Sequence, residues 1–152
     1  MTSRKRAIAV KKSHTAKALI ISSSDRYIHF VSHAYAGKEH DYSILKAVFP
    51  PEHAWFENLT VRLDLGYKGF DKDYRCKKLH LPHRKPRLAE LTDEQRAENK
   101  ELAKERIRVE HSIGGMKRYR ILSDRLRVHD FELYDDILLV CAGLWNFYLK
   151  HK

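Results

Sequence analysis

The stretch Ala18-Leu-Ile-Ile-Ser-Ser-Ser-Asp-Arg-Tyr-Ile-His-Phe-Val-Ser-His-Ala-Tyr35 predicts a β-hairpin close to the start of the chain. Residues 18–22 form a short apolar run with β-branched side chains, and residues 27–35 alternate aromatic and β-branched residues with smaller or polar ones. Between them, Ser22-Ser-Ser-Asp25 predicts a turn, because these short polar side chains bond to their own backbone. Two paired strands therefore begin the fold.

The elements downstream of the hairpin predict an α/β fold. Asp41 is expected to cap a helix over residues 42–48, which Pro50 and Pro51 end. Further strands are expected over residues 60–65 and 77–81. The order of elements predicts a sheet flanked by helices, in a single domain over residues 1–152.

Two helices follow these strands. Thr92-Asp-Glu-Gln95 is a capping box that opens a long helix, on which Ala103, Ile107, Glu110 and Gly114 share one face. The last helix is expected over residues 132–150. Its apolar stripe, which we expect to lie in the core, consists of Tyr134, Ile137, Leu138, Cys141, Leu144, Trp145 and Tyr148.

The charge balance points to a polyanionic partner. The 152 residues contain 30 Lys and Arg against 20 Asp and Glu, a net charge of +10. Nucleic acid is the commonest partner of so basic a protein, although a merely basic surface is the simpler alternative. No apolar run approaches the length of a membrane span, and no apolar segment of a secretory signal follows the basic N-terminus. We therefore expect a cytoplasmic protein that binds DNA and no membrane.

The positive charge is locally densest in residues 77–87, which contain no acidic residue. This segment is the best candidate for contacts with DNA phosphates, although a solvated loop is an equal alternative. Its basic residues are Lys77, Lys78, Arg84, Lys85 and Arg87. Cys76, His80 and His83 are also zinc-ligand types, but no fourth ligand is identified and the spacing does not favour zinc.

Two carboxylates have the setting of metal ligands. Asp64 ends an apolar strand and precedes Gly66, and ligands of α/β sheets collect beyond the carboxyl ends of strands. Glu110 is expected on the apolar face of its helix, where a glutamate is costly unless it is paired or metal-bound. Each has a structural alternative: Asp64 as a turn cap, and Glu110 as an ion pair with Arg106. Mg²⁺ takes one or two carboxylates and leaves room for phosphate and water.

Four motifs in order carry a family resemblance. They are Lys11-Lys-Ser-His-Thr-Ala-Lys17, Gly37-Lys-Glu-His-Asp-Tyr42, Val61-Arg-Leu-Asp-Leu-Gly-Tyr-Lys-Gly-Phe70, and Arg106-Ile-Arg-Val-Glu-His-Ser-Ile-Gly-Gly-Met-Lys-Arg-Tyr-Arg-Ile-Leu122. Together they resemble the later part of bacterial insertion-sequence DDE transposases, from about Lys11 to Tyr148.

The resemblance implies an RNase H-like mixed sheet flanked by helices, and a catalytic triad that holds Mg²⁺ or Mn²⁺ for DNA cleavage and strand transfer. Asp64 matches the second aspartate and Glu110 the glutamate of the triad. Arg106 and Lys117 match residues that position the glutamate and the DNA end. A tyrosine of the same helix signature is replaced by Ala103, which puts that contact in doubt.

The first aspartate of the triad has no match in this sequence, so we expect an N-terminally truncated catalytic domain. Asp25 lies in a turn and Asp41 at a helix start, and neither is a convincing substitute. One interpretation is an enzyme part, completed by an upstream transposase product and forming a homo-oligomer when active on transposon ends and target DNA. The alternative is a non-catalytic transposase remnant or a basic DNA-binding protein. The DNA just upstream of Met1 discriminates between them.

Overall fold

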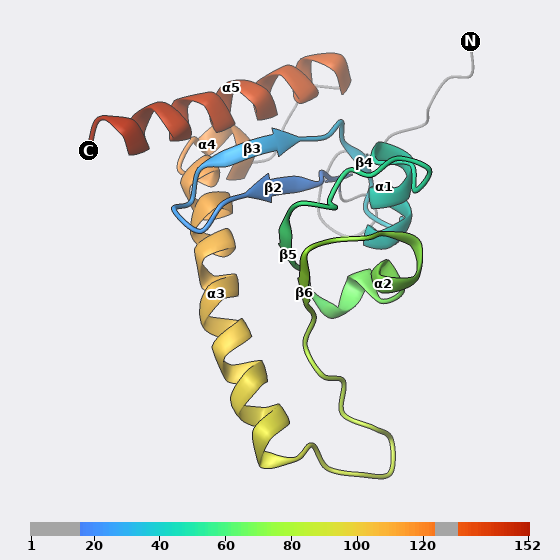
Figure 1. Ribbon diagram of the computed structural model, residues 1–152. Coiled ribbons are helices and arrows are strands. Elements are labelled where there is room, and N and C mark those ends of the chain that lie inside the picture. Colours follow the sequence, from blue (N-terminus) through green and yellow to red (C-terminus); the bar gives the residue numbers. More distant parts are fainter. Residues whose placement is uncertain (1–15, 124–130) are drawn as a thin grey trace. The chain divides into compact units, whose positions relative to one another are not determined.

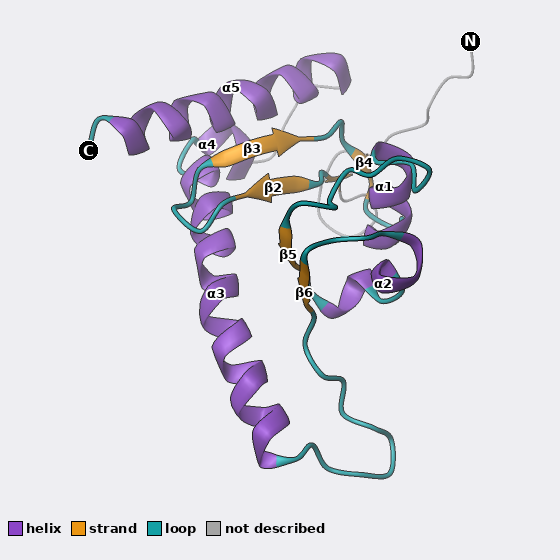
Figure 2. Ribbon diagram, viewed as in Figure 1, coloured by secondary structure: helices purple, strands orange, loops and turns teal. Residues whose placement is uncertain are grey.

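The computed structural model describes residues 16–123 and 131–152 of a mixed α/β chain (Figure 1). The chain divides into two compact units. The first consists of residues 1–39 and 107–152, and the second of residues 40–106. Three two-stranded sheets and a set of helices make up the described part (Figure 2).

The predicted hairpin is present in the first unit, but each of its strands is interrupted. β1 (Ala16–Lys17) pairs antiparallel with β4 (Tyr35–Ala36), and β2 (Ile20–Ser22) pairs antiparallel with β3 (Ile28–Val31). Between the two pairs, Leu19 N donates to Ser32 Oγ at 2.8 Å, and Ser32 N donates to Leu19 O at 2.9 Å. The serine hydroxyl therefore takes the place of a carbonyl acceptor where the ladder is broken.

Helix α5 (Phe131–Lys150) covers this hairpin and supplies most of the first unit's core. Leu138, Cys141 and Trp145 are buried, as the apolar stripe predicts, whereas Leu144 and Tyr148 are exposed and that part of the prediction is wrong. Leu144 and Tyr148 lie at the edge of the stripe, on the side of α5 away from its buried residues. The other buried members of this core are Ile28, Ala34, Met116 and Ala142.

A single side chain of α5 pairs with the backbone of β3. Ile28 N donates to Asn146 Oδ1 at 2.8 Å, and Asn146 Nδ2 donates to Ile28 O at 2.7 Å. Asn146 thus satisfies both backbone groups of a buried residue that would otherwise lack partners. This pairing fixes the position of α5 along the strand.

Helix α3 (Asp93–Lys117) reaches the first unit with its last turns and is followed by α4 (Arg120–Ser123). Gly115 is the position at which another element approaches its backbone closely. A Cβ atom placed there would lie 2.3 Å from Cδ2 and Cε3 of Trp145. The same indole donates from Nε1 to Arg26 O at 3.0 Å, and Ser112 Oγ donates to that carbonyl at 3.1 Å.

The second unit has an aromatic core. Phe70 is fully buried, and its ring stacks on Tyr74 with centroids 4.8 Å apart. Phe56 packs against both rings, and Tyr74 donates from its hydroxyl to Phe49 O at 2.6 Å. Large rings bury much apolar area per residue, so a few of them suffice for a small unit.

The secondary structure of the second unit agrees with the prediction in its main elements. They are α1 (Asp41–Val48), β5 (Thr60–Arg62), the 3-10 helix η1 (Leu65–Tyr67), α2 (Phe70–Asp73), β6 (Lys78–His80) and the first part of α3. β5 and β6 are parallel, with Thr60 opposite Lys78. The sequence predicted neither η1 nor α2, which are too short to show a helical period.

The two predicted helix caps have different outcomes. The capping box is confirmed: Gln95 N donates to Thr92 Oγ1 at 3.2 Å, and Thr92 N donates to Gln95 Oε1 at 3.1 Å. The predicted cap at Asp41 is wrong. Asp41 is the first residue of α1, the N-cap is His40, and His40 makes no side-chain capping bond. A first-turn aspartate is favourable through the helix dipole instead.

Candidate active site

Asp64 lies just beyond the carboxyl end of β5, where the sequence places it. It is the N-cap of η1, and its Oδ1 accepts a hydrogen bond from Leu65 N at 2.7 Å. The turn-capping role is therefore real, and it orients the carboxylate, whose side chain is 53% exposed. An exposed, oriented carboxylate remains accessible to a cation or a substrate.

Arg106 is brought to Asp64 within the second unit. Its Nη1 lies 3.5 Å from Asp64 Oδ2. Both side chains are about half exposed, so this ion pair contributes little to stability. The guanidinium does place a fixed positive charge beside the carboxylate, where a phosphate oxygen would also be stabilised.

A second carboxylate and a phenol lie in the same neighbourhood. A Cβ atom on Gly66 would lie 3.1 Å from Asp41 Oδ2, so α1 approaches the loop after Asp64 closely. Burial, together with the charges of Asp41 and Asp64, raises the pKa of Tyr67 to about 12. The sequence did not predict that Asp41 and Tyr67 lie near Asp64, because this proximity depends on tertiary contacts and not on spacing along the chain.

Glu110 belongs to the first unit, and the prediction that it lies on an apolar, buried face of α3 is wrong. The face that it shares with Ala103, Ile107 and Gly114 is exposed, and Ile107 is 46% accessible. The buried face of α3 carries Ser112, Gly115 and Met116 instead. Val109 and Ile113 are only partly exposed and lie on this buried side, so α3 carries apolar residues on two sides, and only one of them packs against Trp145.

Because Glu110 is exposed, it does not carry the cost of a buried charge that would require a metal ion or an ion-pair partner. A solvated carboxylate needs no buried partner, so its position alone does not mark it as a ligand. Arg106 lies four residues earlier in α3, and Lys117 is the last residue of that helix and is exposed. The assignment of Glu110 as a metal ligand stays a prediction.

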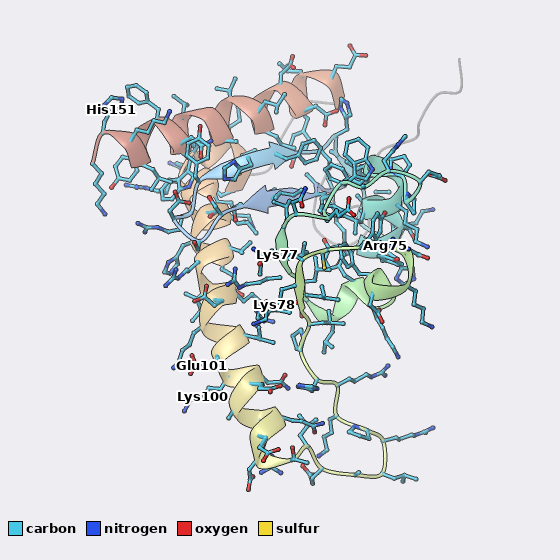
Figure 3. All side chains as sticks on the ribbon, viewed as in Figure 1. Arg75, Lys77, Lys78, Lys100, Glu101 and His151 are labelled. Atoms are coloured by element: carbon cyan, nitrogen blue, oxygen red, sulfur yellow. The ribbon has the colours of Figure 1, made fainter. Side chains whose placement is uncertain are left out.

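The basic segment extends from β6 into the loop that precedes α3. Lys77 and Lys78 lie at the start of the segment (Figure 3). Arg84, Lys85, Pro86 and Arg87 line an open hollow of about 550 Å³. These side chains are exposed, as a phosphate-contacting surface requires.

The described residues contain no cluster of side chains arranged around a metal ion. Carboxylate oxygens, as on Asp64 and Asp41, are the ligands that Mg²⁺ and Mn²⁺ prefer. Among residues 16–123 and 131–152, no group of three or more His, Cys, Asp or Glu side chains is arranged to hold a metal ion. Of the three residues that the sequence offered for zinc, His83 contacts a carboxylate instead: its Nε2 lies 2.6 Å from Glu98 Oε2.

Comparison with known proteins identifies the family. Residues 8–146 match the family model of the DDE superfamily endonucleases, and the chain belongs to that family. It is also similar to a probable transposase for insertion sequence element IS702 from Microchaete diplosiphon, with 32% identity over 142 residues. The resemblance to insertion-sequence DDE transposases is therefore confirmed.

The alignment with this probable transposase covers 91% of this chain and 48% of the relative, so the chain spans about half the length of that relative. No solved structure matches the chain. The first five residues of the motif that begins at Lys11, residues 11–15, lie outside the described residues. In the described part of the chain, no helix is both long and apolar enough to cross a membrane.

Proposed function

We propose that this chain contributes Asp64 and Glu110 to the divalent-metal site of an insertion-sequence transposase that cleaves and joins DNA at transposon ends. The observation that carries the proposal is the oriented, half-exposed carboxylate of Asp64 beyond the end of β5, with Arg106 beside it. Family membership supports the reaction class. We further propose an RNase H-like catalytic domain over the whole chain.

Two carboxylates bind the metal ion in this proposal, and two basic side chains bind the DNA. Asp64 and Glu110 would hold Mg²⁺ or Mn²⁺, and a bound ion would supply activation of a water or hydroxyl and stabilisation of the leaving oxygen of a phosphodiester. Leu65 N holds the Asp64 carboxylate in one orientation by its hydrogen bond to Oδ1. Arg106 and Lys117 would contact phosphate oxygens and offset the charge of the DNA end.

The first aspartate of the triad is proposed to come from a polypeptide stretch that this sequence does not contain. The IS702 relative is about twice as long as its aligned part, which leaves room for such a stretch. The active species is then a complex, and we propose a homo-oligomer in which an upstream transposase product completes each site.

Strand cleavage of a labelled transposon-end duplex tests the proposal. We expect the purified chain alone to leave the duplex intact with Mg²⁺, and the chain together with the upstream product to cleave it. Asp64→Asn and Glu110→Gln should each abolish that cleavage without lowering DNA binding, because the amides keep the shape but lose the charge that a metal ion needs.

Two outcomes would overturn the proposal in different ways. Metal-dependent cleavage by the chain alone, abolished by Glu110→Ala, would show that the site is complete without an upstream product. Full cleavage by both amide variants in the complex would show that neither carboxylate is a ligand. Binding without cleavage in every combination would identify the chain as a DNA-binding transposase remnant.

A further inference from the structure

The loop that carries Arg84, Lys85 and Arg87 is fastened to α3 at His83, whose ring contacts Glu98 and whose backbone pairs with Asn99. His83 N donates to Asn99 Oδ1 at 2.7 Å, and Asn99 Nδ2 donates to His83 O at 2.9 Å. The amide of Asn99 therefore pairs with both backbone groups of His83, as a neighbouring strand would. All of these residues belong to the second unit.

The cations of this loop are not equivalent. Lys85 forms an ion pair with Glu90, and Glu90 also lies 3.4 Å from Arg96 Nη2. In the described part of the chain, Arg84 and Arg87 make no ion pair with any acidic side chain. Two exposed guanidinium groups are thus left with their donors available on a loop whose backbone is held in place.

We propose that residues 83–87 form a clamped loop that binds the phosphodiester backbone of DNA, with Arg84 and Arg87 as its contacts and Asn99 as its positioning residue. This inference rests on the proposed function, because it takes DNA as the partner. It adds that Lys85 contributes less than its neighbours, since Glu90 competes with phosphate for it.

The chemistry of the loop selects the backbone of DNA rather than its bases. A guanidinium presents paired donors that match two phosphate oxygens, and its positive charge is attracted by any DNA sequence. Two such groups on a loop whose position is fixed lose less conformational freedom on binding than they would on an unconstrained one. The loop therefore supplies affinity and register, and sequence preference has to arise elsewhere.

The contacts are tested by fluorescence anisotropy with a labelled duplex of arbitrary sequence over a range of salt concentrations. Arg84→Ala and Arg87→Ala should each weaken binding about fivefold and flatten the salt dependence of log K by about 0.9. Lys85→Ala should have a clearly smaller effect. Lys100→Ala is the matched control, because it removes the same charge from the side of α3 opposite the loop (Figure 3).

Glu90 provides a test in the opposite direction. Glu90→Gln frees Lys85 and should strengthen binding about threefold, since one further phosphate contact becomes available. Glu101→Gln changes the net charge equally on the far side of α3, where Glu101 pairs with Lys104, and should have little effect (Figure 3). Equal effects of the two glutamine variants would mean that net charge, and not this loop, governs binding.

The positioning role of Asn99 needs readouts that loss of fold would not produce. Asn99→Ala leaves every charge in place, yet it should weaken binding severalfold and flatten the salt dependence, with the helical circular dichroism unchanged. It should also speed tryptic cleavage after Arg84 and Arg87, whereas the Lys85–Pro86 bond resists trypsin in both proteins. His83→Ala removes the exposed ring contact with Glu98 but keeps the backbone that Asn99 holds, so cleavage and affinity should both stay close to wild type.

The outcomes separate this inference from the proposed function. No binding of DNA by the wild-type chain would overturn the DNA partner, and with it both proposals. Binding that survives Arg84→Ala, Arg87→Ala and Asn99→Ala unchanged would overturn the clamped loop alone. Faster cleavage in Asn99→Ala with unchanged affinity would confirm the fastening but refute its role in DNA binding.

Discussion

Replacing Gly115 by alanine should destabilise the first unit, and the size of the effect follows from the geometry. The added Cβ would lie 2.3 Å from Cδ2 and Cε3 of Trp145, and 2.6 Å from Cε2. Such distances are well inside van der Waals contact, so the indole must move. Trp145 is only 6% exposed, and it cannot move without disturbing Met116 and Cys141 in the same core.

Three effects determine the magnitude. Overpacking a core by one methyl group costs about 1–3 kcal/mol. Displacing the indole also weakens the hydrogen bond from its Nε1 to Arg26 O, worth about 1 kcal/mol. Alanine in a helix gains about 1 kcal/mol over glycine. The expected net loss for Gly115→Ala is therefore about 2 kcal/mol.

Gly114→Ala is the matched control, because nothing lies within 4 Å of its added Cβ. It retains the gain in helix propensity and should stabilise the chain by up to about 1 kcal/mol. The two neighbouring substitutions thus have opposite signs. Urea unfolding followed by tryptophan fluorescence measures both, in a Trp55→Phe background in which Trp145 is the reporter. Equal or greater stability of Gly115→Ala would refute the close packing of α3 on α5.

Three further predictions follow from single contacts. Asn146→Ala leaves both backbone groups of Ile28 without partners and should cost about 2 kcal/mol in urea unfolding; an unchanged midpoint would contradict the pairing. Thr92→Ala removes the acceptor for Gln95 N and should cost about 1 kcal/mol, with faster amide exchange confined to the first turn of α3. Burial, and the neighbouring Lys78 and Arg62, lower the pKa of His80 below 6.5. The unfolded chain then binds more protons than the folded one, so stability falls as the pH drops below about 6.5; an NMR titration of His80 with a midpoint above 6.5 would exclude this.

The sequence predicted the elements whose signals are local. The hairpin follows from alternating β-branched and aromatic residues, and the start of α3 follows from the reciprocal bonds of Thr92 and Gln95. The breaks in the hairpin were not predictable, because they depend on the Ser32 hydroxyl meeting Leu19 across the sheet. Short elements such as α2 lack the length that shows a period.

The candidate site was predictable in its residues but not in its surroundings. The position of Asp64 follows from a strand that ends before glycine, and the structure agrees. The buried face of α3 was assigned wrongly, because apolar residues lie on two sides of this helix, and periodicity does not show which side packs against Trp145. The neighbourhood of Asp41 and Tyr67 depends on tertiary contacts between separate segments.

The amide of Asn99 carries no net charge, and this has a consequence for how salt acts on the protein. Dissolved ions screen the attraction between arginine and phosphate, but they leave a bond between two neutral amides almost unchanged. The backbone of His83 should therefore stay bound to α3 as the ionic strength rises, while the Lys85–Glu90 ion pair weakens and the occupancy of the loop by DNA varies. A plot of log K against log salt should then remain a single straight line, without the curvature that a loop changing its conformation would introduce.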